Sequence, residues 1–565
     1  MRRFLEFIVE HTLRFPGEPL KEIIIGSELY AAGKDFDPRL SAVVRVDATR
    51  LRTKLREYYE SEGASDPLII DLPKGSYTPV FHAAAPQNQA GAAGAQQRRG
   101  DTSIAVLPFS NLSPQPRDYF SDGLAEEIIH ALSSVPGLRV VARTSAFAMK
   151  HKNADVREVG RALNVDFVLE GSVRQSGDAL RITVQLVSTS DGYQLWSCRY
   201  DRRIEDVFAV QDDIAREIIS MLRVSAANRP NALASDVPAN FDAYALYLRG
   251  RHHLNRQTRD SFYRAIEYCD RALAQSPGYA AALSSKAVAL FYLGMFAMEP
   301  PLQVMPKARE AAAQALESSE RAGEALSVTA CTRAMLEWDW AGAEALFHKS
   351  LAVQPGSELS EHLFAMFALL PLARIDEALA RIERARQSDP LSTFVSASLA
   401  AVLLMARRNE QAEAECRRAL ELDANFWRPV VGLGRCFEAK GNYEGAIACF
   451  ERAMLLSDHV PSAIGALGHA YGRVGDIERA HQLIRELDEL ARHRYVSPYG
   501  RVLIYLGLGD ERVFDWLDRS YEERAGWLMY LATDPRFDRL RTNQRFRSFL
   551  QRLHLPLLTH PAAHA

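Results

Sequence analysis

The chain has 565 residues, too many for a single hydrophobic core, so its length predicts several domains. It carries 68 Lys and Arg residues against 71 Asp and Glu residues, a formal net charge of -3 at pH 7, which excludes a globally basic protein that coats nucleic acid. Its six cysteines are scattered without a CxxC pair or a histidine at ligand spacing, which indicates reduced thiols and predicts no metal site.

The amino terminus lacks the ordered charged, apolar and small-residue regions of a signal peptide. No apolar run approaches the roughly 20 residues that a helix needs to cross a bilayer. These features predict a cytoplasmic protein without a membrane partner.

Residues 1–81 are predicted to hold three helices and a hairpin. Apolar residues recur at helical spacing over Arg2–Leu13 and again over Leu20–Tyr30, with Pro16-Gly17 between the two segments. Residues 33–38 are predicted to separate the second helix from the third. In the third segment the apolar residues fall at intervals of four, three and four, so one stripe of this helix faces a core; they are Val44, Ala48, Leu51 and Leu55.

The other faces of the third helix are almost wholly cationic. Between Arg39 and Arg56 only Asp47 is acidic. Beyond the helix, Leu68–Leu72 and Tyr77–Phe81 read as two short strands joined by Pro73-Lys74-Gly75-Ser76. A basic helix followed by a hairpin is the plan of a winged helix.

The helix ends in Arg-Leu-Arg-Thr-Lys-Leu and the hairpin tip reads Lys-Gly-Ser-Tyr, a combination that resembles the DNA-binding domain of OmpR/ToxR-type transcription regulators. In that family the helix enters the major groove of double-stranded DNA, where an arginine can fork onto guanine or a phosphate. The predicted DNA-binding residues, from the resemblance and from the cationic face, are Arg45, Thr49, Arg50, Arg52, Lys54, Arg56, Lys74 and Tyr77. The alternative is that this basic face is merely solvated.

Residues 82–102 are rich in Ala, Gln and Gly and are predicted to be a flexible linker. Residues 103–226 then show two steps of a strand followed by a helix, and Asp155 is predicted to cap the second of these helices. Strands with alternating apolar residues follow, and the helix Val207–Leu222 closes the region. The sequence segments IAVLPF, SDGLAEE, LEGSVR and QLW resemble those of the TolB-like amino-terminal domain of bacterial signalling proteins. That family implies no catalytic role, and Glu126 and Glu127 are interpreted as charges in the first turn of a helix.

After a predicted linker at 227–240, residues 241–513 are helical and repeat every 34 positions, the period of tetratricopeptide repeats. The equivalent alanines are Ala378, Ala412, Ala446 and Ala480. Such arrays form a superhelix whose concave face holds a protein or peptide. The alternative is that the array only spaces or dimerises the chain. Residues 514–565 are predicted to be a capping segment that seals the last repeat.

No phosphate-binding loop, HExxH, GxSxG or kinase motif set occurs, so no catalytic or cofactor-binding residue is predicted. Proteins that pair a TolB-like domain with tetratricopeptide repeats are sometimes fused to a class III nucleotide cyclase domain. No unassigned stretch of this chain is long enough for one, and the prediction is that the chain is not an enzyme.

The predicted fold is multidomain: a winged helix-turn-helix, then an α/β TolB-like domain, then an all-α tetratricopeptide superhelix. The predicted function is a cytoplasmic, DNA-binding transcription regulator in which the TolB-like and repeat regions bind partners. Regulators of the OmpR type often bind adjacent half-sites in pairs, which makes a homodimer one expected assembly. The alternative function is a non-enzymatic scaffold in which the winged helix is a docking module.

Overall fold

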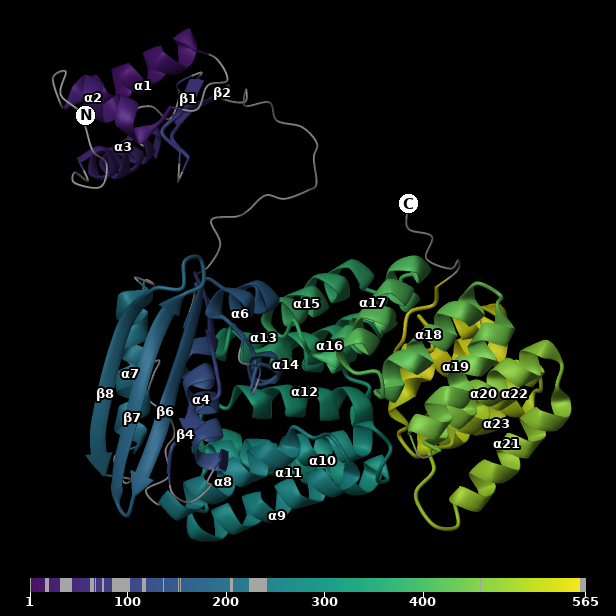
Figure 1. Cartoon of the computed structure of the whole chain (residues 1–565). Helices are drawn as coiled ribbons and strands as arrows, with labels where there is room; N and C mark the ends of the chain where they lie inside the picture. Colours follow the sequence, from purple (N-terminus) through teal and green to yellow (C-terminus); the bar gives the residue numbers. More distant parts are fainter. Residues whose placement is uncertain are drawn as a thin grey trace. The chain divides into compact units, whose positions relative to one another are not determined.

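The computed structural model of the chain describes residues 2–15, 20–30, 43–60, 66, 68–73, 76–83, 102–113, 118–135, 137–150, 152, 154–203, 207–222, 241–457 and 459–558. The chain forms two compact units, residues 1–99 (unit 1) and residues 100–565 (unit 2) (Figure 1). The linker predicted at 227–240, most of the linker predicted at 82–102, and the turns predicted at 16–17 and 33–38 lie outside the described residues.

Unit 1 contains the helices and strands that the sequence predicts. The elements are α1 (Arg2–Arg14), α2 (Glu22–Leu29), α3 (Val43–Glu60), β1 (Leu68–Asp71) and β2 (Val80–Ala83). The two strands pair antiparallel, with Leu68 opposite Ala83 and Asp71 opposite Val80. β2 begins three residues after the predicted start at Tyr77, and Pro79 just before it has no N–H to offer a strand ladder.

A small apolar core holds the three helices of unit 1 together. The predicted stripe of α3 points into it: Val44 and Ala48 are fully buried and Leu51 is 3% exposed. The remaining fully or nearly fully buried members come from α1, from α2 and the segment just before it, and from the residue that follows β1, and they are Phe4, Ile8, Leu20, Ile25 and Leu72. Because the buried residues of α3 occupy one stripe, the rest of that helix surface is left for polar side chains.

The first part of unit 2 is an α/β region. Its elements are β3 (Thr102–Val106), β4 (Ser110–Asn111), α4 (Asp118–Ser133), β5 (Leu138–Val140), α5 (Arg143–Phe147), α6 (Val156–Leu163), β6 (Phe167–Ser176), β7 (Ala179–Ser188), β8 (Gln194–Arg203) and α7 (Val207–Met221). The strand order is β5-β3-β6-β7-β8, and the short β4 pairs with β6. β3 runs parallel to β5 and β6, whereas β6, β7 and β8 form an antiparallel meander.

The sequence patterns of this region are confirmed in detail. Alternate residues of β7, from Leu180 to Leu186, are at most 2% exposed, as expected for a strand with one buried face. The carboxylate of Asp155 accepts a hydrogen bond from the Arg157 N–H at 2.8 Å and caps α6. Gly177, between β6 and β7, and Gly192, between β7 and β8, have φ of 57° and 76°, a left-handed conformation that favours glycine.

The second part of unit 2 is a stack of antiparallel helix pairs (Figure 1). Its helices are α8 (Phe241–Leu254), α9 (Arg259–Gln275), α10 (Ala280–Met295), α11 (Pro301–Ser318), α12 (Gly323–Glu337), α13 (Trp340–Val353), α14 (Glu358–Phe364), η2 (Ala365–Leu369), α15 (Ile375–Ser388), α16 (Thr393–Met405), α17 (Asn409–Leu422), α18 (Trp427–Ala439), α19 (Tyr443–Leu456), α20 (Pro461–Val474), α21 (Ile477–Leu490), α22 (Tyr499–Leu508), α23 (Arg512–Glu522), η3 (Gly526–Tyr530), η4 (Pro535–Leu540) and α24 (Gln544–Arg552). The second helices of four successive pairs start 34 residues apart, at Ile375, Asn409, Tyr443 and Ile477.

Small residues allow this close stacking. The four equivalent alanines of the repeat are all fully buried. A Cβ placed on Gly434 of α18 would lie 2.5 Å from the Phe450 ring of α19, so only glycine fits there. Gly441 and Gly475 end α18 and α20 with φ of 76° and 84°, which a side chain would strain. These positions account for the 34-residue period that the sequence shows.

The carboxyl-terminal segment reaches far beyond the last helix pair. The indole N–H of Trp340, at the start of α13, donates to the carbonyl of Leu553 at 2.9 Å. Arg407 forms an ion pair with Asp538 at 2.8 Å, and Arg435 forms one with the buried Asp534 at 3.3 Å. The segment predicted as a cap therefore also contacts residues that lie 99 to 213 positions earlier in the chain.

Candidate nucleic-acid interface

The cationic face of α3 is the candidate interface, and two of its predicted residues point into solvent. The Arg50 side chain is 71% exposed and lies 3.9 Å from the Asp47 carboxylate, a distance at which a surface pair contributes little stability. Lys54 is also exposed. Their positive charges are therefore available to an anionic partner. Arg45, Thr49 and Arg56 lie on α3 but their side chains are outside the described set, as is the whole of Lys74.

Arg52 has a different environment from Arg50, although the sequence groups them together. Its Nε donates to the carbonyl of Leu72 at 2.9 Å, and its Nη2 donates to the carbonyls of Pro73 at 3.2 Å and Ser76 at 2.9 Å. The guanidinium thus binds α3 to the loop between β1 and β2. A side chain that makes these three bonds fixes the hairpin against the helix.

Two tyrosines support the same helix. Tyr77 is partly buried against the core of unit 1. The hydroxyl of Tyr30 donates to the Asp47 carboxylate, so the one acidic residue in the basic stretch joins the end of α2 to α3. Burial and the adjacent carboxylate both raise the pKa of Tyr30, so the phenol stays protonated at neutral pH. Sequence patterns could not reveal the Tyr30 contact, because it joins positions 17 residues apart in two different helical segments.

In unit 2 the charged residues form a buried network between the α/β region and the repeats. The Glu126 carboxylate of α4 is contacted by the Nε of Arg143 at 2.7 Å and the Nε of Arg251 at 2.8 Å. Arg251 Nη1 also donates to Glu324 at 2.9 Å. Because α4 begins at Asp118, Glu126 and Glu127 do not lie in its first turn, and that interpretation of the sequence is wrong.

The network controls the ionisation of its members. Burial alone would raise the pKa of Glu126, but the charges of Arg251 and Arg143 outweigh burial and hold that pKa below its ordinary value. For Glu127, which accepts a hydrogen bond from the Tyr247 hydroxyl at 3.0 Å, burial prevails and raises the pKa. The pKa values of two adjacent carboxyl groups are therefore shifted in opposite directions, and the one that is lowered belongs to the carboxylate paired with two arginines.

Backbone and hydroxyl contacts extend this interface to α15. The Ser145 Oγ donates to the Asp389 carboxylate at 2.6 Å, and the N–H of Ala142 donates to the carbonyl of Ser388 at 2.7 Å. The α/β region and the repeats, which the sequence divides at 227–240, thus pack as one compact unit. Sequence patterns could not reveal this, because the bonded residues are more than 240 positions apart.

Within the described part of the chain, no group of three or more His, Cys, Asp and Glu side chains is arranged to hold a metal ion. Among the same residues, no helix is both long enough and apolar enough to cross a bilayer.

Comparison with known families identifies two regions of the chain. Residues 100–217 match a family described as the second domain of HilA/YgeH-like transcriptional regulators. Residues 431–462 match the tetratricopeptide repeat, which confirms the repeat type predicted from the 34-residue period. The α/β region therefore resembles part of a transcription regulator, and it is followed by repeats of a protein-interaction type.

Individual relatives include a regulator and a protein named for an enzyme. Over 296 residues the chain is 24% identical to "Transcriptional regulator HilA" of Salmonella typhimurium, a match that covers 51% of each chain. Over 285 residues it is 36% identical to "Putative adenylate cyclase 3" of Rhizobium meliloti, covering 48% of each. The chain thus spans about half the length of the curated relatives it matches. Among solved structures, the tetratricopeptide repeat protein YrrB is 17% identical, with a TM-score of 0.25, over 36% of this chain and 98% of its own.

The match to the Rhizobium meliloti protein requires a correction. The sequence motifs predict that the chain is not an enzyme, and a relative that is 36% identical and named as a cyclase contradicts that prediction. Short catalytic motifs do not capture this similarity, because it extends over 285 residues.

Proposed function

We propose that the chain is a DNA-binding transcription regulator. In this proposal unit 1 is a winged helix of the OmpR/ToxR type that places α3 in the major groove of DNA, the α/β region is TolB-like, and the repeats hold a protein partner. The HilA/YgeH-like match of residues 100–217 and the similarity to HilA support a role in transcription.

The observation that carries the proposal is that the residues of α3 have three different environments. One stripe is buried in the core of unit 1, Arg50 and Lys54 are exposed, and Arg52 fixes the hairpin beside the helix. A basic helix held rigidly beside a hairpin offers both cations for phosphates and donors for base edges. We assign DNA contact to Arg45, Thr49, Arg50, Lys54, Arg56 and Lys74. Arg52 and Tyr77 would position the helix and the hairpin.

The test is selection of bound sequences from a random duplex-DNA pool by the full chain at two salt concentrations. We expect an enriched motif whose recovery falls as salt rises, because each phosphate contact releases counterions. The double variant Arg50→Gln with Lys54→Gln should lose the motif, while Arg492→Gln, on the repeat surface, should keep it. Enrichment that is unchanged in the double variant would contradict the assignment to α3.

The same selection tests pairing of two chains on DNA. If unit 1 binds adjacent half-sites as a dimer, the enriched sequences should contain two copies of the motif about one helical turn, or 10 base pairs, apart. A single copy at half the length would indicate that one chain binds alone.

A second candidate function is adenylate cyclase activity, which the 36% identity to the Rhizobium meliloti relative favours. Incubation of the purified full chain with ATP and a divalent cation, followed by measurement of cyclic AMP, tests it directly. Product formation above that of a heat-inactivated sample would support this candidate, and its absence under conditions in which the chain binds DNA would favour the regulator.

A further inference from the structure

Arg428 in the first turn of α18 is surrounded by aromatic rings from three helices. Its guanidinium carbon lies 4.1 Å from the ring centre of Phe296, 4.7 Å from that of Trp427 and 5.8 Å from that of Phe394. Phe296 ends α10 and Phe394 belongs to α16, so residues from three different helix pairs of the superhelix meet at one cation. The two phenylalanines also pack edge to face, with centroids 6.0 Å apart.

The Arg428 guanidinium differs from the other buried cations of unit 2 in its contacts with the described residues. Among the described residues, neither an ion pair nor a hydrogen bond involves the Arg428 side chain. Arg435, two turns further along the same helix, is by contrast paired with Asp534. Burial lowers the pKa of Arg428 to about 10, which leaves the guanidinium charged at neutral pH. A desolvated charge that is not neutralised by the fold is costly, and an anion that neutralised it would bind favourably.

The titratable group that shares the Phe394 ring with Arg428 is His362, and it carries no charge at neutral pH. His362 packs edge to face on Phe394 with centroids 5.0 Å apart, and its Nε2 lies 3.0 Å from the Ser398 hydroxyl. Burial lowers the pKa of His362 to about 4, so it is neutral under physiological conditions. One positive charge suits a single carboxylate, whereas a polyphosphate would need several cations.

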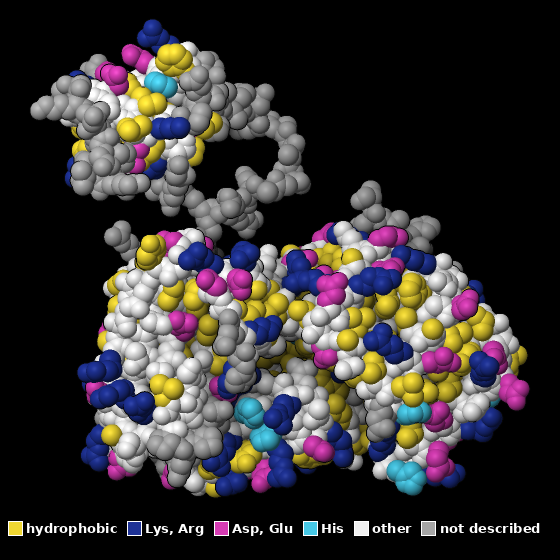
Figure 2. All heavy atoms as spheres, viewed as in Figure 1, with side chains coloured by type: hydrophobic (Ala, Val, Ile, Leu, Met, Phe, Trp, Pro, Cys, Tyr) yellow, Lys and Arg dark blue, Asp and Glu magenta, His cyan; other side chains and the backbone are white. Residues whose placement is uncertain are grey.

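The rings decide which part of the guanidinium a ligand can reach. Phe296 and Trp427 contact the Arg428 guanidinium through cation–π interactions. These contacts leave the N–H groups of the guanidinium to donate to a planar acceptor. Beside them Phe262, Tyr292 and Phe296 form an apolar stack. Figure 2 shows a hollow in the middle of unit 2 in which hydrophobic side chains are visible, over the region of α10, α12 and α16 in Figure 1.

We propose that Arg428, with Phe296, Phe394 and Trp427, is an anchor site of the repeats and binds a carboxylate of a partner peptide next to apolar residues. The carboxylate is that of an Asp or Glu side chain or of the peptide's carboxyl terminus. This inference rests on the proposed function only in that the repeats hold a partner, and it does not depend on DNA binding by unit 1.

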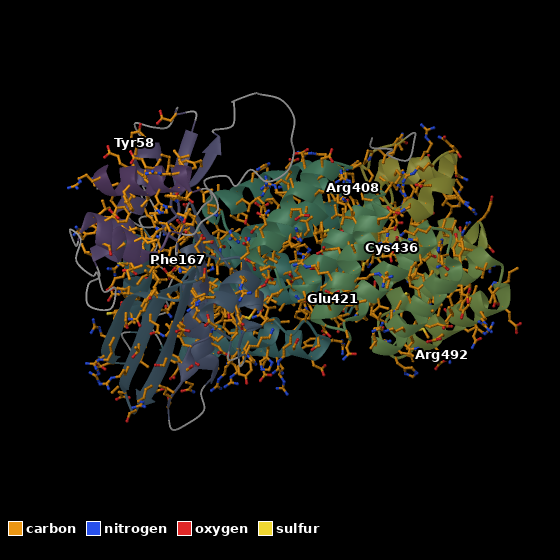
Figure 3. The ribbon with its side chains drawn as sticks, turned by 45° about the horizontal axis from the view of Figure 1, so that its top comes forward. Tyr58, Phe167, Arg408, Glu421, Cys436 and Arg492 are labelled. Carbon is orange, nitrogen blue, oxygen red and sulfur yellow. The ribbon has the colours of Figure 1, made fainter. Side chains whose placement is uncertain are left out.

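The test is selection from a phage-displayed pool of random heptapeptides with the immobilised full chain. Arg428→Gln and the control Arg492→Gln are screened in parallel. Figure 3 labels Arg492 on the outer side of the repeats, where its side chain is 72% exposed. We expect enriched peptides with an acidic residue beside apolar ones, and their loss only in Arg428→Gln.

Synthetic versions of the enriched peptides then test the carboxylate on the unaltered chain, which keeps the test valid if a variant folds poorly. Replacement of Asp or Glu by Asn or Gln should weaken binding about tenfold or more, as loss of a hydrogen bond to a charged group predicts. If only amidation of the peptide's carboxyl terminus has this effect, the terminal carboxylate is the ligand. Equal binding of acid and amide forms would overturn the proposal.

Three other results would also overturn it: no enriched peptide, equal enrichment by Arg428→Gln, or binding of ATP that Arg428→Gln abolishes while no peptide binds. The last would identify a nucleotide site instead. The DNA selection is repeated with Arg428→Gln. An unchanged DNA motif together with lost peptide binding separates this site from the proposed DNA-binding function.

Discussion

The cationic residues of α3 and those at the interface between the α/β region and the repeats belong to the same residue types but have opposite surroundings. On α3 the Arg50 side chain is 71% exposed and its nearest carboxylate is 3.9 Å away. At the interface Arg251 is 17% exposed and contacts two carboxylates at 2.8 and 2.9 Å. The first arrangement leaves charge for a ligand, whereas the second uses it to hold the fold. Removal of each charge should therefore have different consequences.

The largest effect is expected for Arg251→Met. It would leave Glu126 with Arg143 alone and Glu324 without Arg251, both away from solvent. We expect the free energy of unfolding of unit 2 to fall by about 3 to 5 kcal/mol, as for the removal of one partner from a buried ion pair. Urea unfolding followed by circular dichroism measures the loss. Addition of Glu126→Gln and Glu324→Gln to Arg251→Met should restore part of it, and an unchanged midpoint in the single variant would show that the network adds no stability.

Glu358 at the start of α14 should make the stability of unit 2 depend on pH. Burial, with a contribution from Asp389, raises its pKa to about 7. A raised pKa in the folded state means that folding binds a proton, so the stability due to this group is complete below its unfolded pKa and is lost as pH rises through 7. Glu358→Gln should therefore stabilise the chain at pH 8 by about 2 kcal/mol relative to wild type, with little difference at pH 4. A difference between the two proteins that is the same at both pH values would contradict this.

A smaller effect is expected for Arg52→Gln, which removes the bonds from α3 to the carbonyls of the hairpin loop. Loss of bonds from a charged donor should cost about 1 to 2 kcal/mol locally. Hydrogen exchange of peptides that cover residues 68–83 should quicken about tenfold in the full chain. Lys54→Gln, on the same helix but exposed, is the matched control and should leave exchange unchanged. Unchanged exchange in Arg52→Gln would show that the hairpin is held by other contacts.

The smallest effect on stability is expected for Arg50→Gln. An exposed ion pair at 3.9 Å should change the free energy of unfolding by no more than about 0.5 kcal/mol. The effect of Arg50→Gln should instead appear in binding. If Arg50 contacts a phosphate, the slope of log affinity for DNA against log salt should fall by about one. A large loss of thermal stability in Arg50→Gln would place this residue with Arg251, among those that hold the fold.

The sequence by itself determined the elements and their order. The period of Val44, Ala48 and Leu51, the alternation along β7 and the 34-residue spacing are local signals, and the structure has the corresponding helix, strand and helix pairs. Such signals are reliable because they depend on which side of one element is buried. The similarity to a protein named as a cyclase was not accessible in this way, because it extends over half the chain and not over a short motif.

Only the tertiary structure decided what each charged residue does. From the sequence, Arg50 and Arg52 are equivalent members of a basic face, yet Arg52 donates to the hairpin while Arg50 remains in solvent. The sequence suggests that Glu126 interacts with a helix dipole, whereas in the structure it accepts a hydrogen bond from Arg251, 125 positions away. Arg428 is one of many repeat arginines, and only the convergence of α10, α16 and α18 places it among aromatic rings. The reason is physical: the energy of a charge depends on burial and on its partners, and both are set by contacts between residues far apart in the chain.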